Sequence, residues 1–115
     1  MADEAALRDC LQRLGAKRVE ATLLAALVRR GAMGTQEIVD HTGLRQPEVS
    51  VGMRMLRERD WVEAEAVPRQ GKGRPMHKYR LRAERGRIRA HYEKMGRRAI
   101  ESYERAMKVL DEGLA

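Results

Sequence analysis

At 115 residues the chain is long enough for one compact domain and at most one extended appendage. Its 24 Lys and Arg residues outnumber 17 Asp and Glu, and the resulting net charge of +7 favours either a polyanionic partner or simply a basic, solvated surface. The single cysteine excludes an internal disulfide, and no apolar run is long enough to span a bilayer or to act as a signal peptide, so we predict a cytoplasmic protein.

Two helices are predicted before residue 31. Residues 3–14 repeat apolar side chains at helical spacing behind two acids that suit a helix N-terminus. Their stripe includes Cys10, for which we expect a buried structural thiol and keep a redox-sensing role as the alternative. Residues 17–30 carry a wider apolar face and end in two arginines and a glycine, so this helix is expected at the centre of the core.

A helix-turn-helix is predicted over residues 35–59. After a loop at residues 31–34, Thr35 can cap a short helix that ends at Gly43, and a second helix follows over residues 46–59. The second helix has an apolar face of Val49, Met53 and Leu56 at i, i+4 and i+7. Its opposite face suits the major groove of DNA, although such a face can simply be solvated. That outer face consists of Gln46, Ser50, Val51, Arg54 and Arg57.

A β-hairpin is predicted next. Residues 61–67 and 77–81 alternate as strands do, and residues 69–75 between them have the glycines and prolines of an open tip. From residue 69 to residue 82 the sequence contains six cations and no acid, as expected of a wing that follows a helix-turn-helix. These cations are Arg69, Lys72, Arg74, Lys78, Arg80 and Arg82.

One long helix is predicted over residues 84–113. At 1.5 Å per residue it would be roughly 45 Å long, more than a small three-helix core can cover, so we expect its apolar stripe to pair with a second copy of the chain. Gly96 in mid-helix marks either a close approach of two backbones or a tolerated glycine. The predicted interface consists of Ile88, Tyr92, Met95, Ala99, Tyr103, Met107, Leu110 and Leu114.

Over residues 17–82 the chain resembles winged helix-turn-helix regulators of the MarR/ArsR/TrmB-like group of bacteria and archaea. The resemblance is carried by GLRQPEVSVGMRMLRERDWV, which matches the group's recognition helix, and by GKGRPMHKYRL, which matches a Gly-Arg-Pro wing followed by a Tyr-x-Leu strand. It implies that the helix enters the major groove and that the wing reaches the backbone or the minor groove. By position, Gln46, Ser50, Val51 and Arg54 would face bases, and Lys72 and Arg74 would be wing contacts.

The sequence departs from that group in three places. Arg45 replaces the usual Ser or Thr cap, which removes about 1 kcal/mol of capping but adds a cation beside the phosphates. Val51 and Gly52 replace a basic or polar pair, so base readout is expected to be sparse. Asp60 replaces a glycine before the first wing strand, where it tolerates a left-handed turn. No sugar-binding domain is expected after the winged unit, so we do not expect this chain to share the sugar-sensing role found in that group.

The remaining polar residues indicate neither a metal site nor catalysis. His41, His77 and His91 fall in three different elements without ligand spacing, and Ser50 has no His and Asp partners. We therefore predict a protein that is not an enzyme and needs no cofactor or metal. The methionines are expected either to pack in the hydrophobic core or to line a cavity for a small-molecule effector, and the sequence does not identify such an effector.

Together these features predict a mainly α fold with a small β-hairpin (α+β). Residues 1–83 would form a winged helix-turn-helix and residues 84–115 a dimerisation helix. The predicted function is a homodimeric, sequence-specific regulator of transcription that binds double-stranded DNA through Arg45, the outer face of helix 46–59 and the wing. The alternatives are a winged-helix module that binds protein in the transcription machinery and a sequence-neutral, chromatin-type DNA-coating protein.

Overall fold

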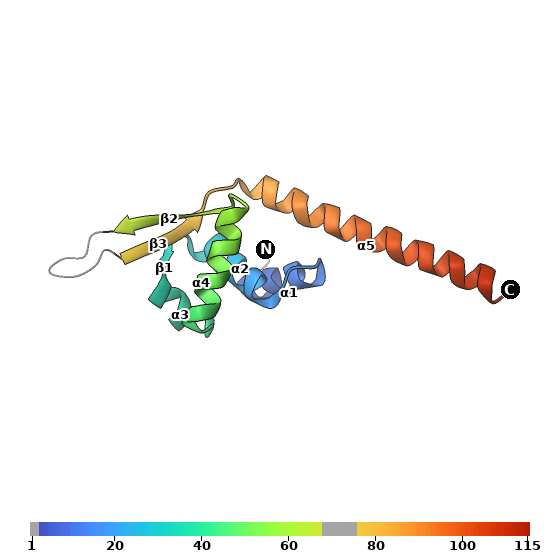
Figure 1. Cartoon of the computed structure of the whole chain (residues 1–115), viewed down its shortest axis with the longest axis horizontal. Coiled ribbons are helices and arrows are strands. Elements are labelled where there is room, and N and C mark those ends of the chain that lie inside the picture. Colours follow the sequence, from blue (N-terminus) through green and yellow to red (C-terminus); the bar gives the residue numbers. More distant parts are fainter. Residues whose placement is uncertain (1–2, 68–75) are drawn as a thin grey trace.

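A computed structural model of the chain describes residues 3–67 and 76–115 (Figure 1). A compact group of four helices carries a hairpin on one side and a long helix on the other, and the molecule measures 74 × 28 × 25 Å. This is a winged helix-turn-helix, which confirms the predicted fold class; helix and strand ends differ from the predicted ones by no more than one residue. The elements are α1 (Glu4–Arg13), α2 (Arg18–Arg30), β1 (Met33–Gly34), α3 (Thr35–Thr42), α4 (Gln46–Glu58), β2 (Val62–Val67), β3 (Met76–Leu81) and α5 (Arg85–Gly113).

The helix ends follow from local chemistry. Asp3 caps α1, because its Oδ1 accepts a hydrogen bond of 2.8 Å from the backbone N–H of Ala6. Gly43 ends α3 at φ 75°, a left-handed conformation that costs glycine little. Asp60 adopts φ 61° between α4 and β2, as expected for the residue that stands in the place of a turn glycine.

The sheet has three antiparallel strands in the order β1-β3-β2. β1 is a correction to the sequence analysis, which had placed residues 31–34 in a loop. Met33 pairs with Tyr79 and Gly34 with Lys78, so a strand of two residues anchors the hairpin to the helical body. Thr35 is not the cap of α3 but its first residue, and the side chain of Glu37 accepts from the N–H of Gly34 at 3.2 Å.

The core centres on α2, as predicted. Leu23, Leu24 and Leu27 are buried there against Ile38 of α3, and Met53 and Leu56 of α4 complete the cluster. Gly52 is also buried and faces α2, because a Cβ on it would lie 2.5 Å from Leu23 Cδ1. Gly52 thus lets α4 lie close against α2, and its place in the sequence, where the group that the chain resembles usually has a polar residue, is part of this packed face.

The first turns of α5 belong to the core of the same chain. Ile88 and Tyr92 are 7% and 2% exposed, so they are not free to face a second copy, and their assignment to a dimer interface was wrong. Met95 packs partly against the core, and a Cβ at Gly96 would lie 2.9 Å from Leu14 Cδ2. The packed unit therefore runs past residue 83 to about residue 96.

Beyond residue 96 every residue of α5 is exposed, and the helix projects away from the body (Figure 1). Cys10 on α1 is exposed as well, contrary to the expected buried thiol. No helix in the described segments is long and apolar enough to cross a membrane.

Candidate nucleic-acid interface

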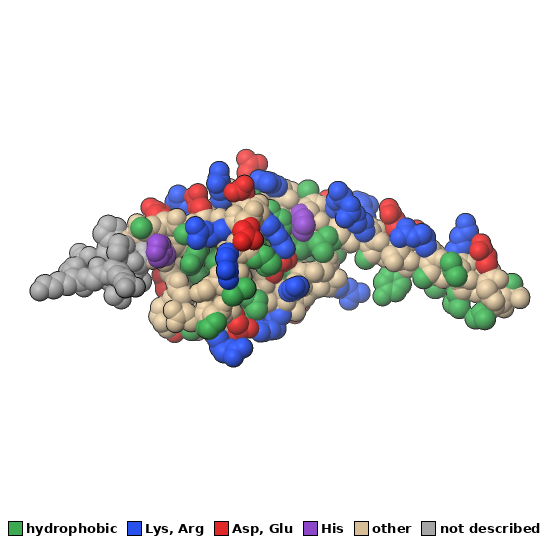
Figure 2. All heavy atoms as spheres, viewed as in Figure 1, with side chains coloured by type: hydrophobic (Ala, Val, Ile, Leu, Met, Phe, Trp, Pro, Cys, Tyr) green, Lys and Arg blue, Asp and Glu red, His purple; other side chains and the backbone are tan. Residues whose placement is uncertain are grey.

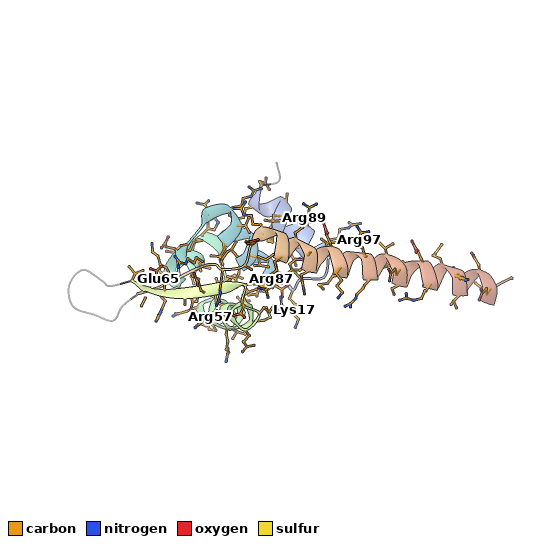
Figure 3. The ribbon with its side chains drawn as sticks, turned by 90° about the horizontal axis from the view of Figure 1, so that it is seen from above. Lys17, Arg57, Glu65, Arg87, Arg89 and Arg97 are labelled. Carbon is orange, nitrogen blue, oxygen red and sulfur yellow. The ribbon has the colours of Figure 1, made fainter. Side chains whose placement is uncertain are left out.

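The two faces of α4 differ sharply in exposure. Val49, Met53 and Leu56 are at most 1% exposed. The predicted outer residues are all exposed, and Val51, the apolar member, is 56% exposed. In Figure 3, Arg57 on α4 and Lys17 at the start of α2 lie on the same side of the molecule. The exposed set is Arg45, Gln46, Ser50, Val51, Arg54 and Arg57.

The start of α4 is held by Glu48 rather than by a capping residue. Its Oε1 accepts from the backbone N–H of Arg45 at 3.1 Å, and its Oε2 lies 2.6 Å from Nη2 of Arg18 on α2. The bond from the Arg45 backbone, and then the Arg18 guanidinium, hold the pKa of Glu48 below its ordinary value. The carboxylate thus satisfies the backbone N–H of Arg45, a different donor from the one that a Ser or Thr cap would bind, and ties the start of α4 to α2.

The base of the wing is less cationic than the sequence suggested. In the β2–β3 register Glu63 faces Arg80 and Glu65 faces Lys78. Arg80 Nε lies 2.6 Å from Glu63 and its Nη1 lies 3.4 Å from Glu65, and the hydrogen bond from Glu63 raises the pKa of the guanidinium. Two carboxylates offset the charge of Arg80, which leaves less of that charge for the phosphate contact predicted for it.

The predicted wing-tip contacts Arg69, Lys72 and Arg74 lie outside the described residues. Within the described part, Lys78 is half-buried on β3. The helical face therefore carries the structural evidence for a nucleic-acid interface. Figure 2 shows blue Lys and Arg side chains spread over the face of the molecule that α4 occupies.

A buried polar cluster connects α4 to α5, and the sequence analysis missed it. Glu20 of α2 is only 4% exposed; it accepts a short hydrogen bond from the Tyr92 hydroxyl of α5 and lies 3.0 Å from Nη2 of Arg59. Arg59 directly follows α4, and its guanidinium carbon lies 5.0 Å from the Trp61 ring centroid. Burial first, and then the bond to Glu20, raise the pKa of Tyr92. The only signal in the sequence was an acid on the otherwise apolar face of α2.

Residues 11–82 match the sequence profile of the family described as "Sugar-specific transcriptional regulator TrmB". The chain belongs to the TrmB family. No curated protein sequence matches it. The profile spans α2, the helix-turn-helix and the hairpin, together with the end of α1, so it confirms the resemblance drawn from residues 17–82.

Solved structures share this TrmB-type fold at low sequence identity. A possible transcriptional regulator from Methanosarcina mazei Go1 is 13% identical with a TM-score of 0.60, covering 90% of this chain and 87% of the other. A structure described as a transcriptional regulator is 19% identical with a TM-score of 0.56, over 94% and 70% of the two chains. TrmBL2, described as an archaeal chromatin protein with a novel mode of DNA binding, is 18% identical with a TM-score of 0.61; 97% of this chain matches, but it spans only 40% of TrmBL2.

The histidines of this TrmB-family chain have structural contacts. His41 Nε2 lies 2.7 Å from Glu4 Oε2 and so links α3 to α1, and the His91 ring meets Trp61 edge-on at 4.9 Å between centroids. His77 is exposed on β3. Over residues 3–67 and 76–115, no three His, Cys, Asp or Glu side chains are placed to hold a metal ion.

Proposed function

We propose that this TrmB-family regulator acts as a homodimer that binds double-stranded DNA sequence-specifically, with α4 of each protomer in a major groove. The observation that carries the proposal is the outer face of α4, where an amide and two guanidinium groups stand exposed above a tightly packed inner face. Gln46 can pair with adenine and Arg54 with guanine, while the exposed Val51 can meet a thymine methyl.

The surrounding cations supply affinity rather than sequence information. Arg45 and Arg57 flank the reading residues, and the wing cations would contact the phosphate backbone or a narrow minor groove. A two-fold dimer requires an inverted repeat, with half-sites about one helical turn apart or a multiple of that distance.

The test is selection from a pool of random duplex DNA at two salt concentrations. Enrichment of an inverted repeat is expected. On the selected site, Arg54→Ala should reduce the binding free energy by about 1–3 kcal/mol and relax the base preference at one position of the DNA sequence. Lys72→Ala should weaken all duplexes about equally and lower the salt slope by roughly one. Arg8→Ala on α1 is the matched control and should leave both properties unchanged.

The second candidate is sequence-neutral DNA coating. It is supported by the short list of base-reading groups on α4, where Ser50 and Val51 occupy the middle of the outer face, and by the fold that this chain shares with the chromatin protein TrmBL2. Salt-sensitive binding without an enriched motif would select this candidate. Absence of DNA binding at both salts would refute both DNA proposals and favour the protein-binding module. A role without catalysis and a cytoplasmic location stay predictions of the sequence.

A further inference from the structure

Two largely apolar hollows lie along α5, both lined in part by residues from the α1 end of the chain. The inner hollow, of about 520 Å³, has walls that include Leu7, Cys10 and Leu11 of α1 and Ile88 of α5. The outer hollow, of about 930 Å³, runs along Gly96, Ile100, Tyr103 and Met107. Leu14 lines both hollows, so they adjoin at this residue, and the α5 residues that line them run from Arg85 to Asp111.

The outer half of α5 presents its own apolar stripe. Figure 2 shows these side chains gathered along the lower edge of the projecting helix, the edge on which α1 lies in Figure 1. Surfaces of this kind are buried against a partner in stable proteins. The stripe consists of Ile100 at 59%, Tyr103 at 76%, Met107 at 60%, Leu110 at 50% and Leu114 at 80% exposure.

The charges beside this stripe are antisymmetric. Residues 89, 93, 97, 104, 108 and 111 are spaced by three, four and seven, so they follow one flank of the helix. Arg89 and Arg97 indeed lie along the same edge of α5 in Figure 3, whereas Arg87 lies on the other edge. For these six residues the signs read plus, minus, plus and then minus, plus, minus, reversing about a point between Ile100 and Glu101; Glu101 itself lies on the same flank at the point of reversal.

Such a pattern specifies the orientation of a helix pair. If two copies of α5 lie antiparallel about that point, Arg89 faces Asp111, Glu93 faces Lys108 and Arg97 faces Glu104 of the other copy, so each of these three pairs is opposite in sign. In a parallel pair this flank faces the opposite flank of the partner helix, so these six charges do not pair with one another. Charges that flank an apolar seam set the orientation of paired helices.

We propose that α5 pairs antiparallel with α5 of a second copy, centred between Ile100 and Glu101, and that the partner's Leu110 and Leu114 fill the inner hollow. The inference rests on the proposed homodimer and adds its orientation and register. In this register the partner's Leu114 comes opposite residues 86–87, and Gly86 lines the hollow together with Cys10.

The rim of the hollow favours an apolar side chain over a small anion. Nη2 of Arg85 donates to the carbonyl oxygen of Val28 at 3.2 Å, and Nε of Arg89 lies 2.9 Å from Glu93. Both cations that line the hollow already have partners, whereas its walls include leucine, isoleucine and tyrosine side chains. A leucine from the second copy matches that surface, and the partner's Asp111 adds a carboxylate beside Arg89.

Cross-linking through the natural cysteine tests the orientation. Position 114 lies 28 residues beyond Gly86, about 42 Å along the helix axis, so no short linker can join Cys10 to position 114 within one chain. The Leu114→Cys variant of the full chain is treated with a short bismaleimide, and the linked peptides are identified by mass spectrometry. The matched control carries Cys10→Ser as well.

The outcomes are distinct. Links between Cys10 of one chain and position 114 of another, lost with Cys10→Ser, support the antiparallel pair. Links that join position 114 to position 114 show a parallel dimer and overturn this inference alone. If sedimentation shows a dimer but neither link forms, the proposal that the partner's Leu110 and Leu114 fill the inner hollow is overturned. A monomer at all concentrations overturns the proposed homodimer and this inference together.

A charge exchange tests the register without introducing cysteines. Arg97 and Glu104 are exposed, and within the described residues neither has an ion-pair partner, so their substitution leaves the fold of one chain intact. Arg97→Glu or Glu104→Arg alone places like charges together at two symmetric points and should raise the dimer Kd by about tenfold. The double variant should restore the Kd. Single variants without effect, or a double variant as weak as the singles, would contradict the register.

Discussion

The contact of α4 with α2 at Gly52 gives the most direct test of how the DNA-facing helix is positioned. A Cβ on Gly52 would lie 2.5 Å from Leu23 Cδ1 and 2.9 Å from Val19 Cγ1. Leu23 is fully buried, so it cannot move aside without displacing its own neighbours. Gly52→Ala should therefore force α4 away from α2.

Two effects of opposite sign determine how much Gly52→Ala changes the free energy of unfolding. Replacing a helix glycine with alanine stabilises by up to about 1 kcal/mol. Overpacking a core by one methyl group costs about 1–3 kcal/mol, and two contacts below 3 Å place this site in the upper part of that range. The net expectation is a loss of about 1–2 kcal/mol, which for a chain of this size lowers Tm by roughly 5 °C.

The assay is thermal and urea unfolding at one fixed protein concentration, because dimerisation makes Tm depend on concentration. Gly86→Ala on α5 is the matched control: within one chain the same chemical change meets nothing within 4 Å, so stability should rise slightly. The two variants are compared at a protein concentration at which sedimentation shows monomers, because Gly86 also lines the hollow proposed to receive the partner's Leu114. If Gly52→Ala stabilises the protein as much as Gly86→Ala does, the argument for close packing of α2 on α4 is refuted.

Three further predictions follow from the contacts of single side chains. Tyr92→Phe removes the hydroxyl that donates to buried Glu20 and should cost about 1.5–3 kcal/mol in urea unfolding; a loss below 0.5 kcal/mol, within the scatter of neutral substitutions, would contradict the buried cluster. The pKa of Glu48 is lowered by folding, so its contribution to stability is present above the ordinary value of 4.5 and is lost as the pH falls through the lowered value. Wild type should therefore be more stable than Glu48→Gln at pH 7, with the difference in Tm shrinking toward pH 3, and a difference independent of pH would contradict the cap. Arg80→Ala should weaken binding to duplex DNA less than Lys78→Ala in a titration, because two carboxylates already offset the charge of Arg80.

The sequence predicted the elements well because their signals are local. The i, i+4, i+7 spacing of Val49, Met53 and Leu56 is a property of one helix, and the structure buries all three. Asp60 was correctly identified as a turn residue since its conformation depends on the adjacent backbone. β1 escaped prediction because two residues are too few for a periodic pattern, and only pairing with distant β3 makes them a strand.

The predictions that the structure corrects concern which part of the molecule covers an apolar side chain. Ile88 and Leu110 belong to one apolar stripe at helical spacing, yet Ile88 is buried within its own chain and Leu110 is 50% exposed. Periodicity identifies a face but not the element that covers it. The cluster around Glu20 unites side chains 72 residues apart, which no local pattern reports.

The cluster around Glu20 also affects how strictly the protein selects the spacing between the two half-sites of its DNA site. One buried carboxylate holds the end of α4, through Arg59, and the start of α5, through Tyr92, so a change in the angle between these helices would unpair a buried charge. In the proposed homodimer the two DNA-facing helices α4 are therefore held at a nearly fixed position and angle relative to the dimer axis. Each base pair added between half-sites rotates one of them by roughly 34–36° around the duplex. A protein built this way should discriminate operators by spacing as sharply as by sequence.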